Sequence, residues 1–486
     1  MSLRKKAVSG IFWAGLEQFG QSGIGFLVQI ILARIIAPEQ FGIFGLILIF
    51  NAIGDTISDS GMCNSLIRTE NADSKDFNTV FISNLSISIL LYVIIFAIAP
   101  SVSSYYQLPV LTDIIRVYSI GIVIGSFISI QSTILRKTLQ FKKIALSSFP
   151  SLVISSIIGI VLAKEDYGVW AIVYMYLSKQ LLAAIFMTIS TMFIPKLIFD
   201  FSIFKKHFLF GYKIMLSLLF DRIADNFISL AIGKNFSLAN VGYYNRANSM
   251  KNFPILSINT ALEQVVYPLF STIGNNDNKL KEVYKQMISL VLFVMTPIMC
   301  VLIFIAKPFF NVLLTSVWLP SVPYFQILCI GGIFYPLNLY LQYLIMLKGK
   351  TKFLLYNSLT KQVLSIIGIL ILVKSSIVHV SIFISAMNIF SFLFLALFYS
   401  KISAYKFGGQ LIDIISYFIP SIITTIVVFI VLKYSGITFS NNYVEIVAVS
   451  TGFVLVYLFI SVITKATGFS TLIKFIENRK SVNNSI

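Results

Sequence analysis

The chain has 486 residues, of which 57% are hydrophobic and 12% are charged, and its mean hydropathy is +0.89. Because soluble proteins carry about 25% charged residues, this composition excludes an ordinary soluble domain and places most of the chain in lipid. The net charge of +18 does not indicate a nucleic-acid partner, since the Lys and Arg residues are scattered between apolar runs. Cys63, Cys300 and Cys329 lie in apolar runs without CxxC spacing, so we expect packing residues and neither disulfides nor a zinc site.

Apolar runs of membrane-spanning length follow one another along the whole chain. A span needs roughly 20 mainly apolar residues, and the runs predict an all-α polytopic membrane protein with about 14 transmembrane helices. In the first half the predicted spans are 11–33, 42–64, 78–100, 111–135, 146–163, 169–193 and 209–232. In the second half they are 242–272, 286–306, 322–347, 353–373, 377–399, 411–432 and 442–464. Glu17 interrupts the first run and no A-x-A cleavage site follows, so we expect a retained helix and not a signal peptide.

The distribution of basic residues between these spans predicts the topology. Lys and Arg are retained on the cytoplasmic side of short loops. Alternate connections are rich in them, as in Arg136–Lys143, or nearly free of them, as around Lys164. The alternation continues to the last span, which supports an even number of helices and predicts that both termini are cytoplasmic.

The chain is predicted to divide into an N-terminal six-helix lobe (1–195), a linker (196–208), a C-terminal six-helix lobe (209–400) and two additional helices with a tail (401–486). The linker alternates basic with apolar residues, a pattern that suits a cytoplasmic segment lying along the lipid headgroups. A weak internal repeat supports two lobes. Leu32–Leu46, reading LARIIAPEQFGIFGL, resembles Leu230–Ala247, reading LAIGKNFSLANVGYYNRA.

Ionisable residues at membrane depth are concentrated in the first two spans of each predicted lobe. A charge is costly there, so such residues usually face a cavity or a partner. These residues are Glu17, Asp55, Asp59, Asp221, Arg222, Asp225, Arg246, Lys251 and Glu263. Their matching positions favour a hydrated central cavity. The alternative is that individual residues snorkel to the headgroups, as Asp59, Arg246 and Lys251 could, or form structural ion pairs such as Arg222 with Asp225.

Motifs of enzymes and ATP-driven pumps are absent from the sequence. It contains no HExxH, no GxxxxGK[ST] and no GxSxG. The two histidines, His207 and His379, are far apart in the sequence. The connections between spans are also short for a membrane-bound glycan polymerase or ligase, which needs catalytic groups on loops. We therefore expect a transporter and not an enzyme.

Several segments resemble the bacterial polysaccharide transporters, the family of O-antigen (Wzx-like) flippases in the multidrug/oligosaccharidyl-lipid/polysaccharide exporter superfamily. The segments are Leu32–Gly42 (LARIIAPEQFG), Ile57–Gly61 (ISDSG), the pair Asp225 and Asn226, Gly242–Ala247 (GYYNRA) and Val266–Ile273 (VYPLFSTI). Relatives often have glycine at the position of Ser237, which puts only the local turn in doubt.

The resemblance implies two six-helix lobes around a central cavity, two further helices, and alternating access to the two sides of the membrane. It implies that the chain moves undecaprenyl-pyrophosphate-linked oligosaccharide repeat units to the periplasmic leaflet of the bacterial inner membrane, for lipopolysaccharide O-antigen, capsule or exopolysaccharide. Expected partners are this lipid-linked substrate, membrane lipids, and a polysaccharide polymerase with its chain-length machinery. A drug or metabolite antiporter of the same superfamily is the nearest alternative.

Candidate site residues follow from the chemistry of such a substrate. A diphosphate needs cations, sugars need polar and aromatic contacts, and the lipid tail can stay in the bilayer. Candidate diphosphate ligands are Arg222, Arg246 and Lys251, and candidate sugar contacts are Asn226, Tyr243, Tyr244 and Asn245. We expect no cofactor, with H⁺ or Na⁺ as the possible coupling ion. The candidate ion-coupling carboxylates are Glu17, Asp55, Asp221 and Asp225.

Overall fold

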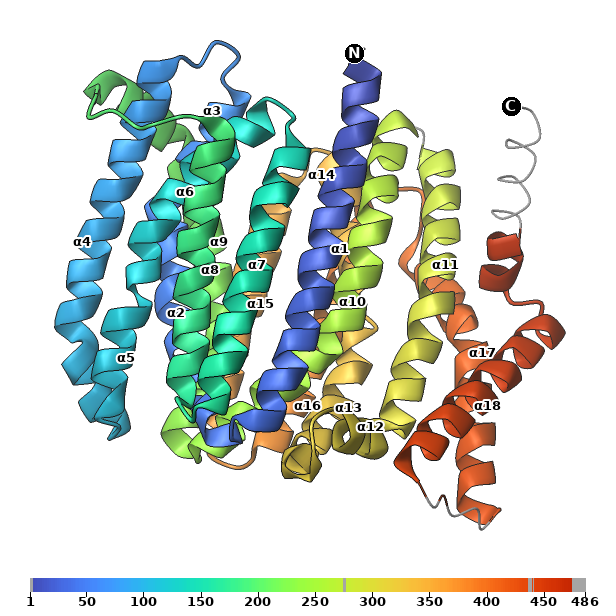
Figure 1. The fold of residues 1–486 in the computed structure, drawn as a ribbon. Helices are drawn as coiled ribbons and strands as arrows, with labels where there is room; N and C mark the ends of the chain where they lie inside the picture. Colours follow the sequence, from blue (N-terminus) through green and yellow to red (C-terminus); the bar gives the residue numbers. More distant parts are fainter. Residues whose placement is uncertain (1–2, 274–276, 436–438, 440, 474–486) are drawn as a thin grey trace. The chain divides into compact units, whose positions relative to one another are not determined.

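The structure, a computed structural model, describes residues 3–273, 277–435, 439 and 441–473, without the side chains of 3–11, 260–269, 271–273 and 351. Of the signature Val266–Ile273 only the side chain of Phe270 is therefore described, and the side chain of Glu263 lies outside the described part. Throughout the described part of the chain all regular secondary structure is helical (Figure 1), as the sequence predicts.

The chain forms two compact units, Met1–Asn245 and Arg246–Ile486. The first contains α1 (Leu3–Ile35), α2 (Pro38–Asp59), α3 (Met62–Arg68), α4 (Ser74–Tyr106), α5 (Val110–Tyr118), α6 (Ile120–Lys137), α7 (Phe141–Lys164), α8 (Val169–Thr191), α9 (Phe201–Asn235) and the start of α10 (Leu238–Ile273). The second contains the rest of α10, α11 (Asp277–Phe304), α12 (Ala306–Leu313), the 3₁₀ helix η1 (Ser316–Ser321), α13 (Val322–Gly332), α14 (Tyr335–Leu347), α15 (Thr351–Leu372), α16 (Ile377–Ile402), α17 (Phe407–Tyr434) and α18 (Asn442–Ile463). The predicted division into two lobes and an additional helix pair stays a prediction.

Each of the predicted spans falls on one helix or on two successive helices, such as α5 with α6. Eleven helices of the described residues are long and apolar enough to cross a membrane, so the count of 14 is not confirmed. The helices α1, α9 and α10 have 33, 35 and 36 residues but are not among the eleven. They carry most of the ionisable residues that the sequence places at membrane depth. These charges lower the hydropathy of helices that are otherwise long enough.

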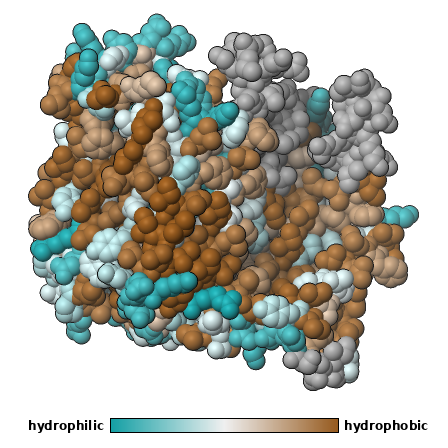
Figure 2. All heavy atoms as spheres, viewed as in Figure 1, coloured by the Kyte–Doolittle hydropathy of each residue, from teal (hydrophilic) through white to brown (hydrophobic). Residues whose placement is uncertain are grey.

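Apolar side chains cover the surface of the helices between their ends. On the face drawn in Figure 2, hydrophobic residues cover the middle of the first unit's helices, and hydrophilic residues gather near the helix ends. Leu90 on α4 and Ile157 on α7 are examples of large apolar side chains that the protein leaves exposed. Such a surface is stable only against lipid tails, so the chain is a multi-pass membrane protein.

The two segments of the predicted internal repeat contact each other in the first unit. A Cβ built on Gly42 of α2 would lie 1.9 Å from the carbonyl oxygen of Leu238, and one built on Gly242 of α10 would lie 2.1 Å from that of Pro38. In the repeat Gly42 corresponds to Gly242 and Pro38 to Leu238, so the contact is reciprocal. Glycine is required at both positions because the two backbones touch.

In the second unit, α17 and α18 pack on α11 beside its internal proline. Pro297 has no N–H, so the carbonyl of Phe293 one turn earlier loses its helical donor. The hydroxyl of Tyr457 on α18 donates to this carbonyl at 2.9 Å. Thr296 and Ser421 form a further hydroxyl contact of 2.6 Å between α11 and α17. These two bonds therefore hold α17 and α18 against α11 at the position of its proline.

We expect Tyr457→Phe to lower the thermal midpoint of the purified protein in detergent. The substitution keeps the ring but leaves the buried Phe293 carbonyl without a donor, a loss of about 1–3 kcal/mol. Tyr443→Phe is the matched control, because Tyr443 of α18 is 63% exposed. Equal midpoints for the two variants would contradict this account of the proline.

Candidate functional site

A cavity of about 190 Å³, with two carboxyl groups among its lining residues, lies in the first unit between α2, α6 and α8. Its lining residues are Asp55, Ser58, Asp59, Ile122, Gly125, Ile128, Ser129 and Gln180. Asp55 and Asp59 are four residues apart and therefore share a face of α2. In liquid water one molecule occupies about 30 Å³, so the cavity has room for several waters. Drug-sized ligands need about 300–1,000 Å³, so it suits water, a proton or a small cation and not an oligosaccharide.

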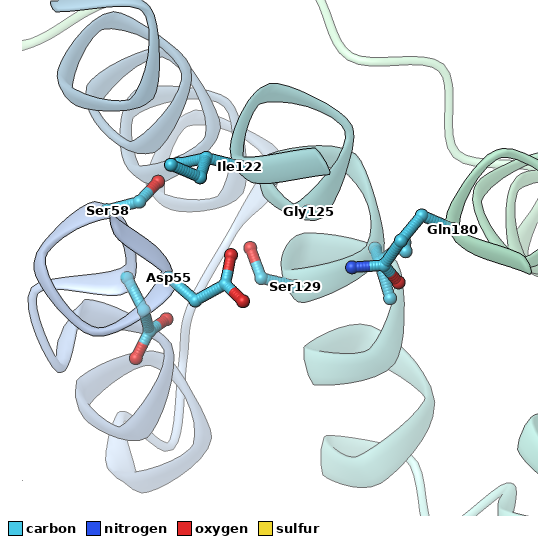
Figure 3. A pocket seen from close by; sticks show the side chains of 8 residues that line it. Asp55, Ser58, Ile122, Gly125, Ser129 and Gln180 are labelled. Atoms are coloured by element: carbon cyan, nitrogen blue, oxygen red, sulfur yellow. The ribbon is translucent and has the colours of Figure 1, made fainter. Parts of the chain in front are cut away.

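Asp55 is directed toward α6, and the carboxyl group points toward Ser129 in Figure 3. A Cβ built on Gly125 would lie 3.3 Å from Oδ1 of Asp55, so the missing side chain leaves room for this carboxyl group. The Asp55 side chain is exposed although it lies between helices, because the cavity reaches it. Asp55 is therefore a carboxylate that water can reach within a helix bundle.

Hydrogen bonds made by Ser58 and Asn84 link α2, α4 and α6 beside the cavity. Ser58 donates to the backbone carbonyl of Asn84 on α4 at 3.1 Å, and the Asn84 amide donates to Ser129 at 3.4 Å. On the α8 side, Gln180 donates to the hydroxyl of Tyr176 at 3.0 Å. The ring of Tyr176 lies 4.6 Å from that of Tyr118. Ile122 and Ile128 of α6 also line the cavity, so polar and apolar side chains share its wall.

Cations on two helices, α9 and α6, interact with the acidic groups of the cavity. Asp55 interacts electrostatically with Arg222 of α9. Asp59 interacts with Arg136 of α6. Opposite charges in a medium of low dielectric attract each other more strongly than in water, so the site combines water access with strong internal fields.

Glu17 of α1 belongs to the same group of charges although it does not line the cavity. It accepts hydrogen bonds from Gln21 at 3.0 Å and from Ser148 of α7 at 3.3 Å. It also interacts electrostatically with Arg136 and Lys179. Arg136 is thus shared between Glu17 and Asp59, which links α1 to the cavity.

The other candidate residues of the first unit lie on α9 and α10. Asn226 donates to the carbonyl of Arg222 in its own helix at 2.8 Å. Asn245 accepts from Ser229 at 2.9 Å, which ties α10 to α9. Tyr244 is buried and interacts with Asp225. In this conformation Asn245 and Tyr244 pack helices together.

Two further candidates of α9 and α10 lie at partly buried positions. Tyr243 interacts with Glu39 at the start of α2. Asp221 of α9 is half-buried and precedes Arg222. Of the predicted site residues, Asp55 and Arg222 are close enough to interact electrostatically. Asp225 and Tyr244 interact with each other but do not line the cavity.

Arg246 and Lys251, the remaining candidate diphosphate ligands, belong to the second unit. Arg246 is 3% exposed, and its guanidinium carbon lies 5.2 Å from the centre of the Trp318 ring. Lys251 is half-buried and packs on α13, because a Cβ built on Gly332 would lie 3.5 Å from its Cδ. In this conformation Arg246 is closed off from a ligand by the side chains packed around it.

Reasoning from the sequence did not assign Ser129, Tyr176, Lys179 or Gln180 to a site. Lys179 and Gln180 form a polar pair within an apolar span, one turn after Tyr176, and this pair was the available signal. Gly121 and Gly125 form a GxxxG pair that indicates close helix packing. Gly121 packs in this way against Tyr176, at 2.5 Å from a built Cβ, whereas Gly125 faces Asp55.

Comparison with protein families gives one match that covers more than half of the chain. The family described as "Polysaccharide biosynthesis protein" matches residues 31–323. The chain is 23% identical over 349 residues to the lipopolysaccharide biosynthesis protein WzxC of Escherichia coli (strain K12), covering 68% of each chain. It is 22% identical to the succinoglycan biosynthesis transport protein ExoT of Rhizobium meliloti (strain 1021), covering 70% of this chain and 69% of ExoT. It is 21% identical to the teichuronic acid biosynthesis protein TuaB of Bacillus subtilis (strain 168), with coverage of 68% and 69%.

Solved structures with the same fold include the lipid II flippase MurJ in an inward closed conformation. The TM-score is 0.76 at 17% identity, and the alignment covers 93% of this chain and 98% of that chain. An inward-facing multidrug resistance transporter of the MATE family in the MOP superfamily gives a TM-score of 0.62 at 18% identity, with coverage of 81% and 98%. The predicted transporter fold is confirmed by these matches.

Proposed function

Because the chain belongs to the polysaccharide biosynthesis protein family, we propose that it is a flippase for undecaprenyl-pyrophosphate-linked oligosaccharide repeat units. It moves them from the cytoplasmic to the periplasmic leaflet of the bacterial inner membrane, with both of its termini in the cytoplasm. The observation that carries this proposal is the family match over residues 31–323. The names of WzxC, ExoT and TuaB link it to three different surface polysaccharides, and the name of MurJ links the fold to the flipping of a lipid-linked sugar.

The proposed transport is ion-coupled, with H⁺ or Na⁺ exchanging at carboxylates of the first unit. Asp55 is the strongest of the four candidates because it lines a water-accessible cavity. Glu17, Asp221 and Asp225 are assigned the same role on the weaker ground of their depth in the helices. When Asp55 is ionised it attracts Arg222, and when it is neutral Arg222 is available to an anionic ligand. Loading of the ion and binding of the diphosphate are thereby linked through one arginine.

The substrate contacts proposed for the remaining residues follow from their chemistry. Arg222, Arg246 and Lys251 are cations suited to the diphosphate, and Asn226, Tyr243, Tyr244 and Asn245 offer amide, hydroxyl and aromatic groups to sugars. Arg246 and Tyr244 are buried here, so their contacts with substrate belong to a different conformation of the transport cycle. A polysaccharide polymerase and its chain-length machinery are the proposed protein partners downstream.

Deletion of the gene tests the proposal through the location of the accumulated intermediate. We expect lipid-linked repeat units to accumulate on the cytoplasmic leaflet, where an added periplasmic glycosidase cannot reach them in intact spheroplasts. Flipped units that accumulate without being polymerised would instead indicate a polymerase or ligase. Normal polysaccharide together with lost efflux of a drug or metabolite would favour the antiporter.

A further inference from the structure

The segment between α8 and α9 turns large apolar side chains outward beyond the ends of both helices. Leu197 is 91% exposed, Met192 87% and Ile194 78%. Phe199 and Phe201 are also exposed. Lys196, Lys205 and Lys206 are exposed between and beside them. We call these eight residues the basic-apolar platform.

The backbone beneath the platform is held by buried polar side chains of α4 and α6. Asn78 accepts from the N–H of Lys196 at 2.6 Å, and Thr79 accepts from the N–H of Asp200 at 3.2 Å. Gln131 donates to the carbonyl of Phe193 at 2.9 Å. Asn78, Thr79 and Gln131 are each 0% exposed. The segment is therefore fixed in place, and its outward apolar side chains are a defined surface.

The start of α9 is fixed as firmly as the segment before it. Asp200 caps the helix by accepting from the N–H groups of Ser202 and Ile203 at 2.8 and 3.2 Å. These bonds and that from the Ser202 hydroxyl lower the pKa of Asp200. About two turns into the helix, His207 is fully buried and bonds Ser65 at 2.8 Å and Asp76 at 3.0 Å. The lysines beside it therefore project from a rigid helix start.

Basic groups outnumber the free acidic groups around the platform. Lys143 donates to the carbonyl of Ser190 at the end of α8, and Lys75 lies near enough to Asp200 to interact with it. Asp200 is engaged as a helix cap, and Asp76 is bonded to His207, with Lys206 at 3.9 Å.

Two more acidic groups precede α4. Asp73 caps that helix, and Glu70 is exposed. Apolar side chains among lysines match a membrane interface that carries negative charge.

We propose that the basic-apolar platform is seated in a bilayer surface of anionic phospholipid, with the apolar side chains among the upper acyl chains and the lysines at the headgroup phosphates. The platform continues from the apolar, lipid-facing ends of α8 and α9, so bilayer lies beside it without any movement of the protein. This contact with the bilayer surface holds the start of α9, the helix that carries Arg222, at a fixed depth in the membrane. This inference does not depend on which substrate the protein transports.

The test uses the full-length protein with Leu197→Cys, labelled with an environment-sensitive fluorophore and reconstituted in vesicles. In vesicles of equal parts phosphatidylglycerol and phosphatidylcholine we expect blue-shifted emission and quenching by lipid with a shallow nitroxide. In phosphatidylcholine alone both effects should be weaker. The unsubstituted chain measures background labelling of its own cysteines, of which Cys63 and Cys329 are buried.

Charge removal separates the lysine contribution from that of the apolar side chains. Each basic residue near an anionic surface contributes roughly fivefold to binding, so Lys196→Gln with Lys205→Gln should lower the ratio of membrane-inserted to water-exposed probe roughly 25-fold. A probe at Tyr167→Cys is the matched control, because this exposed position follows Glu165 and Asp166. Water-like emission from position 197 in both vesicles, or equal seating in both, would overturn the proposal. So would a shift seen only in native membranes, which would indicate a protein partner.

Discussion

Asp55→Asn should reduce polysaccharide export while leaving the amount of protein in the membrane unchanged. The amide has nearly the same shape as the carboxylate and still fits beside Gly125, but it neither exchanges a proton nor attracts Arg222. Coupling free energies between two sites are typically about 1–3 kcal/mol, or 5–150-fold. We therefore expect export to fall roughly 5- to 150-fold, measured as labelled polysaccharide at the cell surface per unit of membrane protein.

A matched control and a second variant identify the cause of that loss. Asp113→Asn removes a carboxylate of α5 that is exposed and outside the cavity lining, and export should stay normal. Arg222→Ala should also reduce export, and combining it with Asp55→Asn should cost less than the sum of the two, since they share one interaction. Normal export by Asp55→Asn would remove the cavity from the mechanism, whereas additive losses would separate Asp55 from Arg222.

The helices and their order could be predicted from the sequence because lipid imposes a simple rule. An apolar run of about 20 residues in a bilayer must satisfy its backbone internally, so it is helical. This rule located α4, α7 and α16 directly. It could not locate the breaks between α5 and α6 or between α13 and α14, because the apolar composition continues through both. The long predicted span 242–272 corresponds to the single helix α10, without an intervening turn.

Only some of the residues that line the cavity could be predicted from the sequence. Asp55 was predicted because a carboxylate within an apolar run is costly and usually faces a cavity or a partner. Its four-residue spacing to Asp59 placed both on one face of a helix. Ser129 and Gln180 were not found, since serine is common in membrane helices and glutamine is uncharged. Their role depends on how α6 and α8 face α2, which no local pattern encodes. Asp59 was weighed as merely interfacial, yet its side chain lines the cavity with Asp55.

The reciprocal glycine contact between α2 and α10 makes a second strong prediction. A Cβ at Gly242 would lie 2.1 Å from the carbonyl oxygen of Pro38, and the obstacle is backbone, which cannot rotate away. Overpacking of this kind costs about 1–3 kcal/mol, and every 1.4 kcal/mol is a factor of ten. Gly242→Ala should thus shift the balance between packed and separated helices roughly 5- to 150-fold toward separation.

Disulfide cross-linking between E39C and Y243C measures this balance, because Glu39 and Tyr243 interact across the same contact. We expect the cross-linked fraction to fall in Gly242→Ala and in Gly42→Ala. In the double variant the cross-linked fraction should fall little further, because one added methyl group already separates the helices and the second then meets no backbone. Gly25→Ala on α1 is the matched control, because nothing lies within 4 Å of its built Cβ and alanine favours a helix. Unchanged cross-linking in Gly242→Ala would mean that the two helices do not approach this closely in the membrane, and the contact between the two halves of the repeat would lose its basis.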